Sequence, residues 1–117
     1  MVNRHAKKMD RLFRALADPT RRQILLRVAQ SDRTVAELSK PFAISPPAIS
    51  RHLKVLEVAG ILERVRAGKY HHFRLKTDPL AEVRQVLEKL TAFWTQRLDA
   101  LEQFLDAEEA AKKPGKP

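Results

Sequence analysis

Residues 45–60 read SPPAISRHLKVLEVAG, and this stretch has the features of a single helix with marked ends. Ser45 followed by Pro46 is typical of a helix N-cap with proline in the first helical position. Gly60 is a typical helix stop, because glycine adopts the left-handed conformation that ends many helices. The sequence therefore predicts one compact helix between these signals.

The two faces of this helix differ in chemistry. At about 100° per residue, one face collects the apolar side chains of Ile49, Leu53 and Leu56. The other face is small, polar and basic. Its donors lie near the positive end of the helix dipole, as entry into a DNA major groove requires, although an ordinary solvated face has the same composition. The candidate DNA-reading residues are Ser45, Pro47, Ser50, Arg51 and Lys54.

The preceding segment, residues 34–44 (TVAELSKPFAI), favours the DNA interpretation. Thr34 and Glu37 have the spacing of a capping box, and Val35, Leu38 and Phe42 have helical spacing. Only a few residues separate this short helix from the next one. The length and pattern predict a helix-turn-helix, in which the second helix reads DNA.

The following segment, residues 61–76 (ILERVRAGKYHHFRLK), predicts a basic hairpin with its turn at Ala67 and Gly68. Alternation places His71, Phe73 and Leu75 on one face of the second strand. A helix-turn-helix followed by such a hairpin is a winged helix. At the wing tip the candidates for DNA backbone or minor-groove contact are Arg66, Lys69 and Tyr70. The same charges also suit a strand edge that avoids pairing with other chains.

Two further helices precede the helix-turn-helix. Residues 1–17 carry an apolar stripe of Ala6, Met9, Phe13 and Leu16, and Asp18-Pro19 then caps a helix from Thr20 to about Ala29. This second helix has arginines at positions 21 and 22, which suit either a solvated surface or a phosphate contact.

Asp78-Pro79 repeats the cap signal and begins a long last helix of about 28 residues, followed by a flexible tail. Its apolar arc is too long for a small domain to cover alone, so we expect part of it to meet a second subunit. Arg97 lies inside this arc. It either snorkels, stacks on an aromatic ring, or pairs with an acid across a dimer. We divide the chain into one DNA-binding and dimerisation domain, residues 1–107, and a tail, residues 108–117.

The ordered motifs resemble one protein family. FRALADPTRRQIL (13–25), SPPAISRHLKVLEVAGIL (45–62) and the hairpin are similar to the ArsR/SmtB-type bacterial transcriptional repressors, over roughly residues 9–106. The resemblance implies a mainly α (α+β) winged helix-turn-helix, with four helices, two strands and a fifth helix in that order. It also implies a homodimer formed by the first and last helices. The expected interface residues are Met9, Phe13, Leu90, Phe93, Trp94, Leu98, Leu101 and Leu105.

Charge supports a nucleic-acid partner. The chain has a formal net charge of +9, and the excess lies in residues 1–77, which hold 17 Lys and Arg against 6 Asp and Glu. Residues 78–117 hold 6 against 8. The positive charge therefore accompanies the predicted helix-turn-helix and wing, as expected of a phosphate-binding surface. With no long apolar run and no secretory signal at the start, we expect a cytoplasmic protein without a membrane partner.

Metal sensing is common in the family that the chain resembles, but its ligands are missing from the corresponding stretches. Residues 35–39 and 80–105 contain neither Cys nor His, and the chain has no Cys at all. His52 fits a packed boundary position better than a ligand. We therefore expect no metal and no cofactor, and the sequence names no effector. With three glycines and no nucleophile elbow or carboxylate–histidine cluster, we also expect no enzymatic activity.

The sequence predicts a homodimeric, sequence-specific DNA-binding regulator, and the family resemblance favours a repressor. Two-fold symmetry implies an inverted-repeat operator. The alternative is a winged-helix protein-interaction module that binds DNA only non-specifically. A protein that shapes DNA without reading it is a third class, against which the polar, groove-facing helix argues.

Overall fold

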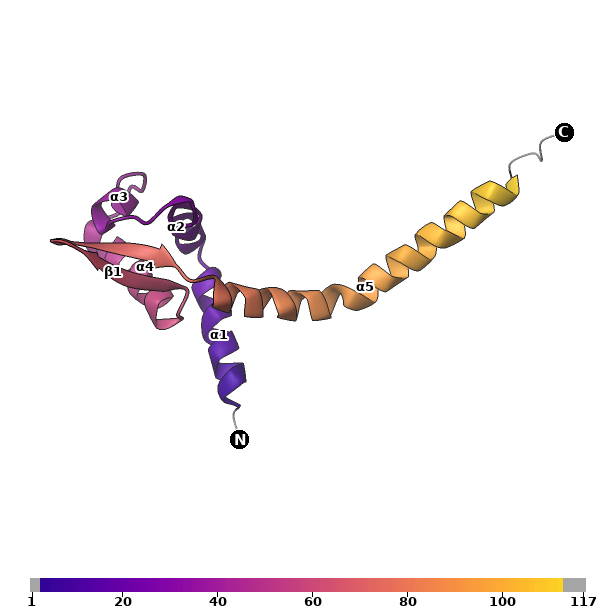
Figure 1. The fold of residues 1–117 in the computed structure, drawn as a ribbon, viewed down its shortest axis with the longest axis horizontal. Coiled ribbons are helices and arrows are strands. Elements are labelled where there is room, and N and C mark those ends of the chain that lie inside the picture. The colour runs from indigo at the N-terminus through magenta and orange to yellow at the C-terminus, as the bar shows by residue number, and fades with distance from the viewer. Residues whose placement is uncertain (1–2, 113–117) are drawn as a thin grey trace. The chain divides into compact units, whose positions relative to one another are not determined.

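A computed structural model describes residues 3–112 and confirms the predicted winged helix-turn-helix and its order of elements (Figure 1). The chain divides into two units, with the boundary between Val83 and Arg84. The first unit holds the winged helix and the first turns of the last helix, and the second holds the rest of that helix. The elements are α1 (Arg4–Leu16), α2 (Pro19–Gln30), α3 (Val35–Ser39), α4 (Pro46–Val58), β1 (Leu62–Ala67), β2 (Tyr70–Leu75) and α5 (Thr77–Lys112).

The helix starts form at the predicted caps. The Asp18 carboxylate accepts the backbone N–H of Arg21 at 3.0 Å at the start of α2. At the start of α4, the Ser45 hydroxyl oxygen accepts the backbone N–H of Ala48 at 3.4 Å. Both caps satisfy N–H groups that have no partner inside their helix. The short loops therefore set the first turn of each helix.

The end of α4 also follows the sequence. Gly60 has a φ of 81°, its N–H donates to the carbonyl of Glu57 at 2.9 Å, and the N–H of Ile61 donates to the carbonyl of Leu56 at 3.0 Å. This pair of bonds is the Schellman motif, which requires the left-handed residue that glycine supplies without strain. The motif turns the chain from α4 directly into β1.

The core lies between α1, α2, the helix-turn-helix and the hairpin. Its largest fully buried side chains are Phe73, Leu12, Ile24, Leu38, Ile49, Leu53, Leu56 and Ile61. The predicted core face of α4 is confirmed, since Ile49, Leu53 and Leu56 are buried. Helix α2 buries Ile24, Leu25 and Val28.

The core face of α1 differs from the predicted stripe. Met9, Leu12 and Ala15 are buried, whereas Phe13 keeps 38% of its surface exposed. Met9, which is also predicted at the dimer interface, is 9% exposed within its own chain and packs in the core of its protomer. The predicted stripe contains Met9 and Phe13, but the helix buries Leu12 and Ala15 beside Met9 and leaves Phe13 partly exposed.

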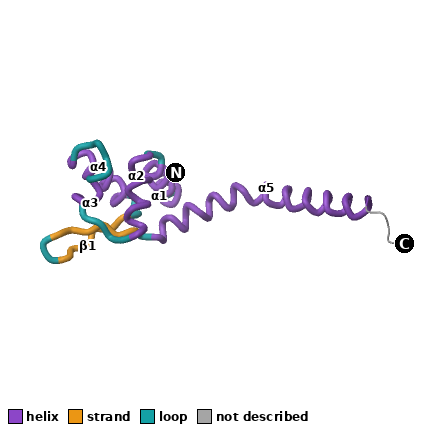
Figure 2. Tube along the Cα trace, turned by 90° about the horizontal axis from the view of Figure 1, so that it is seen from above, coloured by secondary structure: helices purple, strands orange, loops and turns teal. Residues whose placement is uncertain are grey.

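The two strands form an antiparallel hairpin (Figure 2). Its register places Arg64 opposite Phe73 and Ala67 opposite Tyr70. A bridge extends this pairing. The N–H of Phe73 donates to the carbonyl of Arg33 at 2.7 Å, and the N–H of Arg33 donates back at 3.2 Å. The segment before α3 is therefore fixed to β2, on the side opposite β1.

Helix α5 is longer than predicted. It contains 36 residues and continues through Lys112, whereas the sequence predicted about 28 residues and a tail from position 108. Residues 107–112 are alanines and charged residues with high helix propensity, so the helix continues through a segment predicted to be a tail. The rest of the predicted tail, residues 113–117, lies outside the described residues.

Candidate nucleic-acid interface

Helix α4 presents the predicted polar face to solvent. Pro47, Ser50, Arg51 and Lys54 are all exposed, while the opposite face is buried. Within residues 3–112, neither the Arg51 guanidinium nor the Lys54 ammonium has a hydrogen-bond or ion-pair partner. Ser45 is exposed, and its oxygen caps the helix, which leaves its O–H able to donate. The fold therefore leaves the donors of α4 available to a ligand.

Arg21 has a structural role that the sequence left open. Its Nε donates to the carbonyl of Ala15 at 2.8 Å, and its Nη2 donates to the carbonyl of Arg14 at 2.9 Å. These carbonyls lie in the last turn of α1, where the carbonyl of Arg14 also accepts the N–H of Ala17 at 3.2 Å. Arg22 acts similarly, donating to the carbonyl of Leu16 at 2.8 Å. Both arginines fasten the end of α1 to the start of α2, and we do not assign them to phosphate.

His52 on α4 joins this network. Its Nδ1 lies 3.4 Å from Nη1 of Arg21 and 3.8 Å from the carboxylate of Asp18. This contact confirms the prediction of a packed boundary histidine bonded to a neighbour. The N–H of Arg21 lowers the pKa of Asp18, burial opposes this effect, and the charges of His52 and Arg21 add to it. The cluster connects the α1–α2 junction to the buried edge of α4, and so orients the exposed edge.

The wing is anchored at its base and exposed at its tip. Arg64 on β1 donates to the carboxylate of Glu57 on α4 at 2.9 Å, and its guanidinium lies 5.1 Å from the centroid of the Phe73 ring. Arg74 on β2 forms an ion pair with Asp32, with 3.3 Å between the charged atoms. Arg64 and Arg74 therefore hold the hairpin to the helical part. The sequence shows both only as basic residues, and the strand register is the signal that could have placed Arg64 beside Phe73.

At the tip, Gly68 has a φ of 63°, and the Nε of Arg66 donates to its carbonyl at 3.4 Å. This weak bond still leaves most of the Arg66 guanidinium in solvent. Lys69 is exposed, and Tyr70 is 67% exposed. The three predicted wing residues thus remain accessible, and Arg66 also supports the turn.

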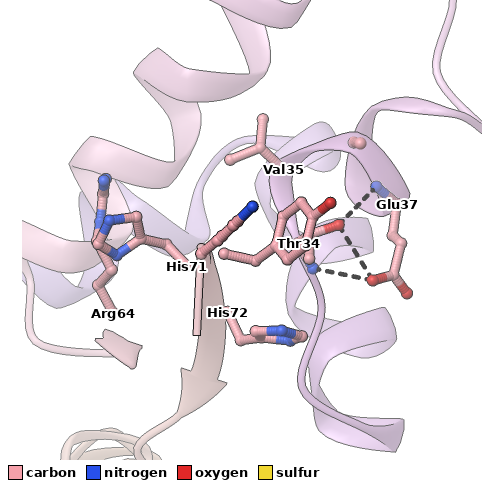
Figure 3. A pocket seen from close by; sticks show the side chains of 9 residues that line it. Thr34, Val35, Glu37, Arg64, His71 and His72 are labelled. Atoms are coloured by element: carbon pink, nitrogen blue, oxygen red, sulfur yellow. Dashed lines mark hydrogen bonds between the residues drawn. The ribbon is translucent and has the colours of Figure 1, made fainter. Parts of the chain in front are cut away.

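A cleft of about 540 Å³ separates the wing from the start of α3 (Figure 3). Lys69 and Tyr70 line it together with Thr34, Val35 and the two histidines of β2, so the structure brings two of the three wing candidates beside the helix-turn-helix. The capping box is formed here as predicted. The Thr34 hydroxyl accepts the N–H of Glu37 at 3.2 Å, and the Glu37 carboxylate accepts the Thr34 N–H at 3.3 Å. The N–H and hydroxyl of Thr34 lower the pKa of Glu37.

Two features of the described residues bear on metal binding and on membrane insertion. Among residues 3–112, no group of three or more His, Asp or Glu side chains is arranged to hold a metal ion. No helix in the same range combines the length and apolar character needed to cross a membrane.

Comparisons with known proteins identify the family. The model of the family described as "Bacterial regulatory protein, arsR family" matches residues 18–64. The chain is 39% identical to the HTH-type transcriptional regulator Rv2034 of Mycobacterium tuberculosis, over 85% of this chain and 90% of the relative. It is 36% identical to the transcriptional repressor SdpR of Bacillus subtilis, over 63% of this chain and 82% of the relative.

The fold agrees with these matches. A crystal structure of the ArsR family transcriptional regulator RHA00566 superposes with a TM-score of 0.72 at 30% identity, covering 81% of this chain and 97% of the other. These three proteins are named as transcriptional regulators or repressors. The chain therefore belongs to the ArsR family of bacterial helix-turn-helix transcriptional regulators.

Proposed function

We propose that this regulator is a cytoplasmic homodimer that represses transcription by binding an inverted-repeat operator. The observation that carries the proposal is the exposed polar face of α4, where Arg51 and Lys54 have no partner within residues 3–112. A guanidinium can donate to O6 and N7 of one guanine together, so we assign base reading to Arg51. Lys54, Ser50, Pro47 and Ser45 complete the surface of α4 that enters the major groove.

The wing contributes affinity in this proposal. Lys69 and Arg66 contact the DNA backbone or the minor groove, and Tyr70 lies beside them. A cation there gains from the negative potential of DNA without reading a base. The anchoring of the wing by Arg64 supports this role, since it holds the base of the hairpin on α4.

Dimerisation is proposed through α1 and α5. Phe13 on α1 is 38% exposed, and Leu90, Phe93, Trp94, Leu98, Leu101 and Leu105 on α5 are 51–69% exposed. The exposed apolar side chains of α5 alone are more than a soluble monomer normally leaves in water. The solution structure of a relative from Mycobacterium bovis is that of a homodimeric winged helix-turn-helix DNA-binding domain, and the same assembly suits this chain. Residues 1–107 then form the DNA-binding and dimerisation domain.

Repression is the direction that the family favours, because SdpR and other relatives are named repressors. The proposal includes no metal effector, since the stretches that would supply ligands lack Cys and His.

The test is selection of bound sequences from a random DNA pool with the full-length protein, at salt near the physiological concentration. We expect enrichment of an inverted repeat whose half-sites lie about one helical turn, or ~34 Å, apart. Binding that depends on salt but enriches no sequence would instead indicate a protein-interaction module.

A further inference from the structure

Helix α1 carries a row of cations that the interface of α4 and the wing does not use. The helix holds five Lys and Arg residues against one Asp. One of these cations, Lys8, forms an ion pair with Glu82 at 3.0 Å. The other four are spaced three or four residues apart, so they share one face of the helix. This set, the α1 row, consists of Arg4, Lys7, Arg11 and Arg14.

The charge of the α1 row is not neutralised inside the protein. All four side chains are exposed, and none forms an ion pair with a residue between positions 3 and 112. Within the same range, their one side-chain hydrogen bond runs from Nε of Arg11 to the carbonyl of Lys7 at 3.5 Å. The row is about 15 Å long, since a helix rises 1.5 Å per residue. Cations this close together repel one another, and an anionic partner relieves that repulsion.

The structure places the α1 row beside the exposed face of α4. Arg11 and Arg14 line a hollow of about 250 Å³ together with Lys54 of α4. A second hollow, of about 520 Å³, extends from Arg11 to the earlier cations of the row, along the end of α4 at Val58. Val58 is 59% exposed and follows Lys54 by one helical turn, so both belong to one face of α4. The row therefore continues the surface that carries the proposed DNA contacts.

The α1 row also stays accessible in the proposed homodimer. At 100° per residue, Phe13 lies about 140° around the axis of α1 from the centre of the row. The side of α1 assigned to the second subunit is thus different from the side that carries the cations.

The position of the α1 row favours DNA over an acidic protein as its partner. Phosphates of one strand follow each other about every 3.4 Å along the duplex axis, so several of them fit within the length of the row. When a helix enters a major groove, the phosphates that border the groove lie against the surface beside that helix. The surface beside the Lys54–Val58 end of α4 is the α1 row.

We propose that the α1 row binds phosphates bordering the major groove that α4 enters, and that it holds α4 in place without reading bases. This contact rests on the DNA binding proposed above and adds a second phosphate-binding surface to α4 and the wing. Asp10 lines a hollow with Lys7, Arg11 and Arg14, so its carboxylate lies among the cations and opposes the phosphates.

Salt titrations of Lys7→Gln and Arg11→Gln test the contact, on the selected operator and on a scrambled duplex of the same length. Glutamine keeps a high helix propensity, so α1 is preserved. We expect each variant to reduce the salt slope by about 2 for a dimer and to weaken both DNAs roughly tenfold near physiological salt. The ratio of the two affinities should stay unchanged.

Lys89→Gln is the matched control, because it removes the same charge from an exposed position on α5. We expect it to leave the slope unchanged. An equal loss in this control would show a general effect of net charge and overturn the proposal. Unchanged slopes in both row variants would also overturn it, and would assign the row to a partner other than DNA.

Asp10→Asn gives a test of opposite sign. Removing this carboxylate leaves the row more positive, so we expect binding to both DNAs to strengthen by roughly threefold. Affinity that does not rise would contradict the placement of phosphates along the row.

The two DNAs separate this inference from the function on which it rests. If the random pool enriches an inverted repeat and the row variants keep the parent slope, the regulator stands and the row contact fails. If no sequence is enriched but the row variants still reduce the slope on scrambled DNA, the row binds phosphate and the sequence-reading function fails.

Discussion

Arginine acts in opposite ways at two positions of this protein. Arg21 donates hydrogen bonds to two carbonyls at the end of α1, and its guanidinium lies 3.4 Å from Nδ1 of His52. Arg51 has no hydrogen-bond or ion-pair partner within residues 3–112. A donor that already makes a hydrogen bond inside the fold is not available to bind DNA. Arg21 is therefore a structural residue, because its donors are bonded within the fold, whereas the donors of Arg51 remain available to bind DNA.

Asp18 gives a prediction about acid stability. Its pKa is lowered in the folded state, chiefly by the N–H of Arg21. A carboxylate with a lowered pKa contributes stability above its unfolded pKa of 3.8 and loses it as the pH falls through the folded value. We expect Asp18→Asn, which keeps an acceptor oxygen at the cap, to lose less stability between pH 6 and pH 3 than the parent protein.

Urea midpoints at the two pH values measure this difference. Asp10→Asn, at an exposed carboxylate in the middle of α1, is the matched control. If the two variants reduce the loss of stability between pH 6 and pH 3 equally, the cap of α2 is not the source of the pH dependence.

The wing turn depends on Gly68, which has a φ of 63° and open space around the position of a Cβ. Backbone strain is therefore the only cost of a side chain there. We expect Gly68→Val to destabilise the turn by about 1–2 kcal/mol and to weaken binding to all DNA sequences, because the wing tip loses its shape. Gly68→Asn should retain binding, since asparagine tolerates this conformation. Fluorescence anisotropy with labelled DNA compares the two variants, and equal losses would indicate that the tip geometry is not what the valine disturbs.

The elements that sequence predicts well here are those with local causes. Caps at Asp18 and Ser45, the capping box of Thr34 and Glu37, and the stop at Gly60 depend on residues a few positions apart, and each one forms. The burial of Met9 and the anchoring of Arg64 depend on which distant element packs against them. The periodicity of a single helix or strand does not identify that element. The last turns of α5 could not be predicted for a different reason, because a segment of alanines and charged residues is compatible with both a helix and a tail.

The charge of the whole molecule predicts strongly salt-dependent binding. Each phosphate neutralised by the protein lowers the logarithm of the binding constant by about 0.9 per tenfold increase in salt. We expect Lys69→Ala to weaken operator and scrambled DNA alike, and to reduce this slope by about 2 for a dimer that loses two contacts. Titrations at four salt concentrations give the slope. An unchanged slope would place Lys69 away from the phosphates.

The central claim is that α4 reads DNA sequence, and Arg51→Ala tests it most directly. The measurement is the ratio of affinities for the selected operator and for a scrambled DNA of the same length, at one salt concentration, in the parent protein and the variant. We predict a loss of about 1–3 kcal/mol on the operator and a smaller loss on scrambled DNA, so that the ratio falls and preference blurs at one position in each half-site. Equal losses on both DNAs would show that Arg51 contacts only phosphate and would contradict the account.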